Sequence, residues 1–255
     1  LWLGIALLLP SDTPSNPLTQ IGFFLALFLL PEVASWAILR AHAATARIDG
    51  GILTIKDDET TAEIPIRDIA AAGLWALPLP GFGLWLTLAS GKRWSQGILS
   101  NDPAAFLQAL LNAGASPTIA NAFATPAGTY ARARAAVVRG FFDRALAKFV
   151  LFPLLLALPA FRLHQVIAYG GTFGEYYTYG LKAYLLGLLI WWAKWAMGML
   201  CFGAVLRLVI EIGNLISAIS LPANAIPVRK ALETAGRLVF YLGVPAWLLI
   251  RLWPW

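Results

Sequence analysis

Long apolar runs alternate with polar segments along this chain, which has 255 residues. A helix needs about 20 apolar residues to cross the hydrocarbon core of a bilayer. Four runs of this kind occur, at residues 18–39, 149–169, 183–206 and, somewhat short, 237–252. A fifth run, 1–9, is too short and ends at Pro10; we interpret it as the tail of an earlier span, with a cleaved signal peptide as the alternative. The pattern predicts four to five transmembrane helices, which begin with a hairpin over residues 1–46.

The pattern changes between residues 47 and 115, where short apolar runs alternate with polar positions, as in strands that bury one face. Connections this short join antiparallel strands. Asp102 and Pro103 are typical of a helix start, and Gly114 is typical of a helix end. We therefore expect a small domain of about five antiparallel strands, closed by one helix and inserted between membrane spans. A linker and a charged helical stalk over 116–148, with its helix expected from Tyr130 to Lys148, should connect it to the spans in 149–255.

The order of these elements resembles the bacterial pleckstrin-homology-like (PH-like) domains of membrane proteins. The resembling pieces are a strand at 51–55, IPIRDIAAAG at 64–73, LWLTLASGKRW at 84–94 and NDPAAFLQALL at 101–111. The resemblance implies a PH-like module that serves docking or assembly rather than catalysis. It implies no role for any particular residue.

Composition and charge place the chain in a membrane. Hydrophobic residues make up 59% and charged residues 13% of it, and its mean hydropathy is +0.71. These values exclude a disordered chain or a disulfide-rich scaffold. Eleven of the 19 basic residues lie between Arg40 and Lys148, and four more lie within or next to the segment 211–233: Arg207, Arg229, Lys230 and Arg237. By the positive-inside rule, the inserted domain and the 211–233 loop are cytoplasmic. The 11–17 loop, the 169–180 loop and the C-terminus then lie on the outer side of the membrane. We expect this membrane to be the inner membrane of a bacterium.

No catalytic signature is present in the sequence. It lacks a phosphate-binding loop, an HExxH pair and a GxSxG elbow, so we expect no enzyme, no metal and no cofactor. Cys201 is the single cysteine, and the two histidines, His42 and His164, are expected on opposite sides of the membrane. The segment 40–148 has 11 basic and 8 acidic residues, which is too balanced for nucleic-acid binding.

Ionisable residues at membrane depth are the remaining candidates, because burying a charge in lipid is costly. Glu32 and Lys194 are predicted within spans, and pairing with each other would neutralise both. Contact of each residue with a backbone carbonyl, a neighbouring protein or water is one alternative, and a transport or proton-relay role is another. Arg162 and His164 lie near the outer surface, where a bound lipid or quinone is an alternative to simple anchoring. Lys92 and Arg93 at a hairpin tip either contact lipid headgroups or form a solvated turn.

Taken together, the patterns favour a non-catalytic accessory, scaffold or assembly subunit of an inner-membrane complex. Its expected partners are other integral membrane proteins and membrane lipids. Two alternatives stay open: a small carrier or channel that uses Glu32 and Lys194, and a membrane enzyme that handles lipid or quinone through Arg162 and His164.

Overall fold

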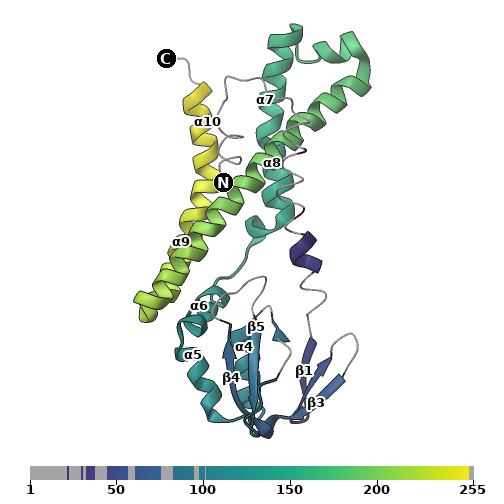
Figure 1. Cartoon of the computed structure of the whole chain (residues 1–255). Helices are drawn as coiled ribbons and strands as arrows, with labels where there is room; N and C mark the ends of the chain where they lie inside the picture. Colours follow the sequence, from purple (N-terminus) through teal and green to yellow (C-terminus); the bar gives the residue numbers. More distant parts are fainter. Residues whose placement is uncertain are drawn as a thin grey trace. The chain divides into compact units, whose positions relative to one another are not determined.

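The computed structural model describes residues 22, 30, 33–37, 45–56, 61–75, 83–94, 98–100 and 102–252. The predicted segment 1–9, most of 18–39 including Glu32, and His42 lie outside these residues. Helix accounts for 72% of the described residues, and the strands form small antiparallel sheets (Figure 1). This confirms the predicted combination of a mostly helical chain and a small antiparallel β region.

The chain divides into two compact units. One, which we call the sheet unit, is formed by Leu29–Val137 and Glu211–Leu232. The described part of the other, the helical unit, consists mainly of Val138–Ile210 and residues 233–252. Two long helices therefore contribute residues to both units.

The sheet unit contains two three-stranded antiparallel sheets. The first has the order β1 (Thr45–Asp49), β2 (Ile52–Lys56) and β3 (Thr61–Pro65), and the second has the order β4 (Ile69–Leu74), β5 (Gly83–Leu88) and β6 (Ile98–Leu99). Gly50 and Gly51 form the β1–β2 turn with φ of 54° and 82°, the positive values that two-residue hairpin loops require. The described residues thus form six strands, where the sequence predicted about five.

One apolar core joins the two sheets to the helix that follows them. Leu53 and Ile55 alternate with more exposed neighbours in β2 and are almost fully buried. Helix α4 (Pro103–Asn112) buries Leu107 and Leu110 in the same core. Its start is fixed as predicted, because the Asp102 side chain accepts a hydrogen bond of 3.0 Å from the backbone N–H of Ala105.

Short helices complete the sheet unit: η3 (Pro117–Ala120), α5 (Asn121–Ala124) and α6 (Pro126–Ala135). The expectation of one helical stalk over 130–148 is wrong. Helix α6 ends at Ala135, and only a short turn, η4 (Phe141–Asp143), precedes the next helix. Gly140 disfavours helix, and its backbone N–H donates to the Asp143 carboxylate at 2.8 Å, which competes with helical hydrogen bonding.

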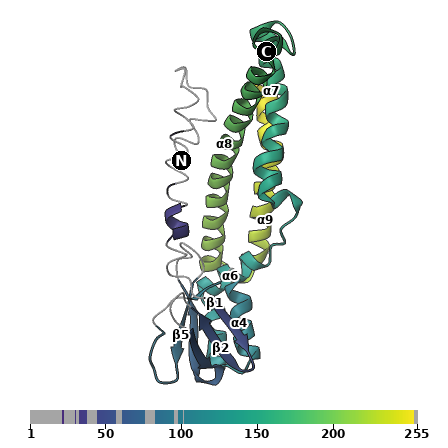
Figure 2. The same cartoon turned by 90° about the vertical axis from the view of Figure 1, so that its right-hand side faces the viewer.

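The helical unit is built on long helices (Figure 2). They are η5 (Ala147–Leu151) with α7 (Phe152–Tyr169), α8 (Gly174–Ser220), and α9 (Ala225–Leu238) continued by η7 (Val239–Gly243) and α10 (Val244–Leu252). Two stretches, Ala147–Tyr169 and Gly174–Ser220, are long and apolar enough to cross a membrane. The predicted run 237–252 is helical as well.

Two predicted loops are mostly helix. The outer loop expected at 169–180 shrinks to a few residues because α8 begins at Gly174, although Gly180 interrupts it with φ 84°. The loop expected at 211–233 is reduced to the turn around η6 (Pro222–Asn224) between α8 and α9. Charged residues end an apolar run in the sequence, but they do not end a helix.

Aromatic packing holds the helical unit together. Phe240 is 1% exposed, and its ring lies between 5.6 and 6.3 Å from those of Phe149, Phe152 and Phe202. Gly203 permits this packing, since a Cβ there would lie 3.0 Å from the Phe149 ring. Trp192 also joins α8 to the start of the α7 stretch, where its Nε1–H donates to the Val150 carbonyl at 3.1 Å.

Candidate functional site

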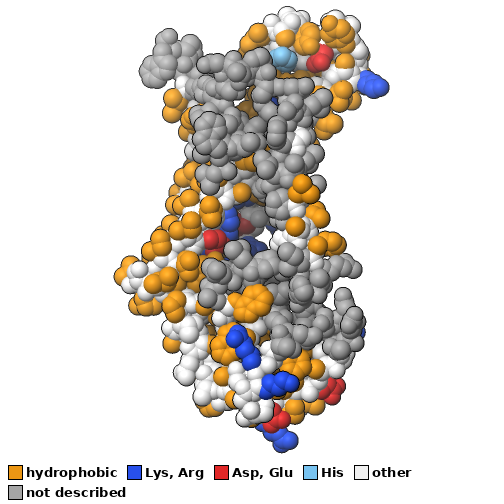
Figure 3. Space-filling view, viewed as in Figure 1, with side chains coloured by type: hydrophobic (Ala, Val, Ile, Leu, Met, Phe, Trp, Pro, Cys, Tyr) orange, Lys and Arg blue, Asp and Glu red, His pale blue; other side chains and the backbone are white. Residues whose placement is uncertain are grey.

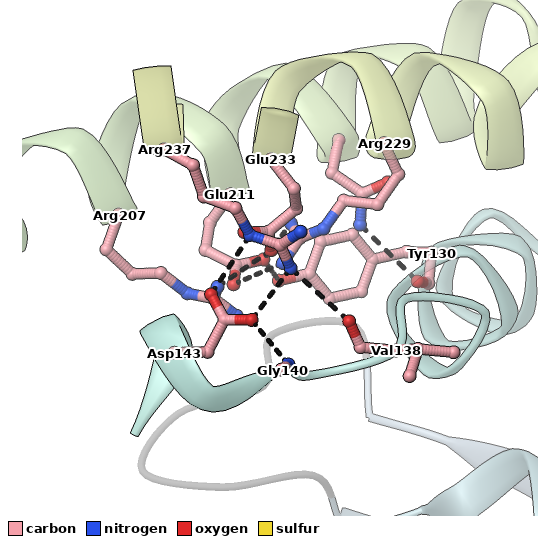
Figure 4. A network of polar contacts seen from close by, with 10 residues as sticks. Tyr130, Val138, Gly140, Asp143, Arg207, Glu211, Arg229, Glu233 and Arg237 are labelled. Carbon is pink, nitrogen blue, oxygen red and sulfur yellow. Dashed lines mark hydrogen bonds and ion pairs between the residues drawn. The ribbon is translucent and has the colours of Figure 1, made fainter. Parts of the chain in front are cut away.

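Glu211 on α8 is the centre of a buried polar cluster in the sheet unit (Figure 4). The Arg229 guanidinium on α9 donates to both of its carboxylate oxygens, at 2.8 and 3.1 Å. The Tyr130 hydroxyl on α6 donates to Oε2 at 2.6 Å. The Arg229 side chain is only 1% exposed. One carboxylate thus joins three helices, with a cation that has almost no contact with solvent.

The surroundings of this cluster keep its charges fixed. Burial, followed by the hydrogen bond to Glu211 and its negative charge, raises the pKa of Tyr130 to about 12. The hydroxyl therefore stays protonated and acts as a donor at physiological pH. Asn214, which is fully buried, adds a 3.4 Å hydrogen bond from its amide to the Tyr130 carbonyl. A protonated phenol, a paired carboxylate and a guanidinium favour holding helices together over proton transfer.

Ion pairs in the helical unit join α9 to η4, which lies just before the α7 stretch, and to α8. The Arg237 guanidinium binds Asp143 through two hydrogen bonds, 3.0 Å from Nε to Oδ1 and 2.8 Å from Nη2 to Oδ2. Arg207 and Glu233 form a second pair at 2.8 Å. The Tyr241 hydroxyl donates to the Phe142 carbonyl at 2.5 Å. Charged groups are thus gathered where the apolar parts of these helices end, as expected at a membrane surface.

A further buried pair lies where α7 leads into α8. The Gln165 side chain is fully buried; its amide donates to the Glu175 carboxylate at 2.6 Å and accepts from the Glu175 backbone N–H at 3.1 Å. Gly187 leaves room for this carboxylate, since a Cβ there would lie 3.0 Å from Glu175 Oε2. This pair fixes the turn between the two helices.

An open hollow of about 670 Å³ adjoins the same turn. It is lined by residues of the 169–174 segment and by Arg162, Tyr177 and Thr178. Arg162 is exposed there. His164 is not among the lining residues; its ring packs 5.2 Å from Trp191 and 6.1 Å from Tyr169. The structure therefore places Arg162, but not His164, at this hollow.

The other predicted residues are scattered. Lys194 lies on α8 with an exposed side chain, while its predicted partner Glu32 lies outside the described residues. Lys92 and Arg93 are both exposed beyond β5, and the Arg93 guanidinium lies 5.0 Å from the centre of the Trp85 ring. The predicted pairing of Lys194 with Glu32 therefore stays a prediction.

The sequence interpretation missed Glu211 and Arg229 because it assigned both to a loop. The sequence does contain an indication that Glu211 lies on a helix. Arg207 and Glu211 are four residues apart, which is the spacing of neighbours on one helix face. It also missed Gln165 and Glu175, for which no sequence pattern stands out.

Among the described residues, no group of three or more His, Cys, Asp and Glu side chains is placed to hold a metal ion. No protein-family model, curated protein or solved structure matches this chain. The fold and the site define a mostly helical protein with two candidate membrane helices, a small antiparallel β region and ion pairs that join its helices.

Proposed function

We propose that this protein is a non-catalytic accessory, scaffold or assembly subunit of a bacterial inner-membrane complex. In this proposal it is a multi-pass protein whose PH-like domain lies in the cytoplasm. It docks other integral membrane proteins through that domain and through the faces of its spans. Two candidate membrane helices and charges gathered at their ends support the membrane location.

Lys194 carries the proposal of a partner. It lies midway between Lys182 and Arg207 on α8, about 18–20 Å along the helix from each, and so at the middle of the proposed span. Its side chain is exposed, and among the residues that the structure describes none forms a hydrogen bond or an ion pair with it. Since a charge at this depth is costly when it faces lipid, we expect a carboxylate from outside the described residues. It comes from a partner helix or from Glu32 of this chain.

The surface of the two apolar helices supports the same conclusion. Only 22% of the most apolar window of each is buried within the protein. Most of this surface is left for lipid and for neighbouring helices. A subunit that docks by its spans needs such a surface, whereas a self-contained channel or carrier would bury more of it around a path.

Purification of the tagged full-length protein in mild detergent tests this function. We expect stoichiometric membrane partners with the wild type and with a Lys182→Met control, and about tenfold less partner with Lys194→Met. A lone, monodisperse monomer would refute the subunit proposal. Retention of the partner by Lys194→Met would instead remove Lys194 from the interface. If the partner were lost from Glu32→Gln but retained by Lys194→Met, Lys194 would likewise not belong to the interface.

The hollow beside Arg162 favours a second candidate function, the handling of a lipid or quinone. An exposed guanidinium next to aromatic residues suits a polar headgroup with an apolar tail. Mass spectrometry of extracted small molecules tests it: a specific lipid or quinone should be retained by wild type and by an Arg139→Ala control, and lost from Arg162→Ala. Equal retention by all three would end this candidate.

A further inference from the structure

The end of α8 has an unusual distribution of side chains. Ile212, Ile216 and Ile219 are 49%, 57% and 60% exposed. The opposite side of the same helical segment is buried and largely polar: Asn214 and Ser217 are 0% and 5% exposed, and Glu211 holds the ion pair with Arg229. This helix therefore turns its polar side chains inward and its isoleucines outward. Figure 3 shows hydrophobic side chains gathered over this end of the α8–α9 hairpin.

Lipid is a poor explanation for this isoleucine stripe, defined as Ile212, Ile216 and Ile219. Ile216 lies about 14 Å beyond Arg207 along the helix axis, outside the proposed span 183–206. The part of α8 that follows the break at Gly180, residues 181–220, is about 60 Å long, about twice the thickness of the hydrocarbon core of about 30 Å. An exposed apolar stripe in water is typical of a protein contact.

The spacing of the stripe indicates what kind of contact. The residues Val209, Ile212, Ile216 and Ile219 follow intervals of three, four and three, which is the alternation of a and d positions in a coiled coil. All four are β-branched, and the flanking e and g positions are Leu208, Gly213, Leu215 and Ser220. Since none of these is charged, nothing repels an identical helix placed alongside in parallel.

From this geometry we propose that the isoleucine stripe binds the same stripe on a second copy of this chain, with the two α8 helices parallel. Anchoring in one membrane aligns the copies, because identical residues then lie at the same height above the bilayer. It also raises their effective concentration, which matters because three isoleucines cannot bury the roughly 1,000 Å² of a stable soluble interface. The parallel alignment and the exclusion of lipid both rest on the proposed membrane location; the heptad spacing does not.

Cysteine cross-linking of the full-length protein in native membranes tests this pairing. In a Cys201→Ala background, Ile216→Cys and Ile219→Cys should each form a covalent dimer on mild oxidation, because identical a or d positions face one another in a parallel pair. Ala231→Cys is the matched control, because it is an exposed position on another helix, α9. We expect about tenfold more dimer from the stripe positions than from the control.

Labelling of the same variants with a membrane-impermeant maleimide after cell lysis separates the remaining outcomes. An Ile216→Cys variant that is labelled but forms no dimer would show an open surface, and one that is neither labelled nor dimerised would show a different occupant. Either result would overturn the proposal. Ile216→Lys in the unmodified chain should lower the number of copies counted per particle in nanodiscs, whereas Ala231→Lys should leave it unchanged. Equal counts for the two variants would also overturn it.

Discussion

Removing one partner of the Arg229–Glu211 pair should destabilise the sheet unit more than any surface change. The Arg229 side chain is 1% exposed, whereas that of Glu211 is 22% exposed. Breaking a buried pair costs about 3–5 kcal/mol, because the remaining charge is left without compensation. Arg229→Met leaves a carboxylate that water partly reaches and that Tyr130 still binds, so we expect about 3 kcal/mol. Glu211→Gln leaves a guanidinium shielded from water, so we expect about 5 kcal/mol.

A variant that replaces both charges tests whether the unpaired charge causes the loss of stability. Replacing both charges, as in Arg229→Met with Glu211→Leu, leaves no buried charge and should be less destabilising than either single change. Scanning fluorimetry of the full-length protein in detergent measures the effect. For a protein of this size, a loss of about 3 kcal/mol lowers Tm by about 6–12 °C.

A surface pair provides the control. Arg67 and Asp68 are 3.9 Å apart with side chains 86% and 54% exposed, so Arg67→Met should cost less than about 1 kcal/mol. A Tm for Arg229→Met no lower than that of Arg67→Met would contradict the predicted cost of the unpaired carboxylate. A smaller loss of stability in Glu211→Gln than in Arg229→Met would contradict it as well, because the predicted order follows from the burial of the guanidinium.

Three further changes probe other parts of the structure. The raised pKa of Tyr130, about 12, means that its stabilising effect is complete below pH 10 and is lost between about pH 10 and 12; in a pH series of Tm, Tyr130→Phe should remove this alkaline loss. Gly128→Ala would place a Cβ 2.1 Å from the Ala122 carbonyl oxygen and should cost about 2 kcal/mol in chemical unfolding, whereas Gly243→Ala, with room for a Cβ, should cost nothing. Gln165→Leu removes a partner of the Glu175 carboxylate and should lower stability by about 1–3 kcal/mol; an unchanged Tm would contradict the role given to this pair.

The sheet unit was the most predictable part of the fold, because local patterns decide it. Alternation around Leu53 and Ile55 marks a strand, and the Asp102 cap with Pro103 marks the start of α4. These features depend on neighbours in the sequence, so the sequence alone was sufficient. The number of strands was not predicted as well, because β6 has only two residues, too few for an alternation to be recognised.

The length of α8 and the Glu211 cluster escaped prediction for one shared reason. An apolar run predicts which residues can face lipid, and the run at 183–206 ends before Arg207 and Glu211. The predicted helix was therefore ended there. The helix continues because these charges are compensated by Glu233 and Arg229 on α9. That compensation becomes visible only when two helices are placed side by side. Charge pairing between elements is information that a single pass along the chain does not contain.

The Glu211 cluster also has a consequence for the order in which the protein folds. Arg229 is 18 residues from Glu211 along the chain, whereas Tyr130 is 81 residues away. Closing the shorter loop costs less chain entropy, so the α8–α9 hairpin should form its ion pair first. Helix α6 is synthesised earlier, yet the Tyr130 hydroxyl has no acceptor until the Glu211 carboxylate is in place. The step that completes the sheet unit would then be the docking of a helix synthesised long before its binding partner.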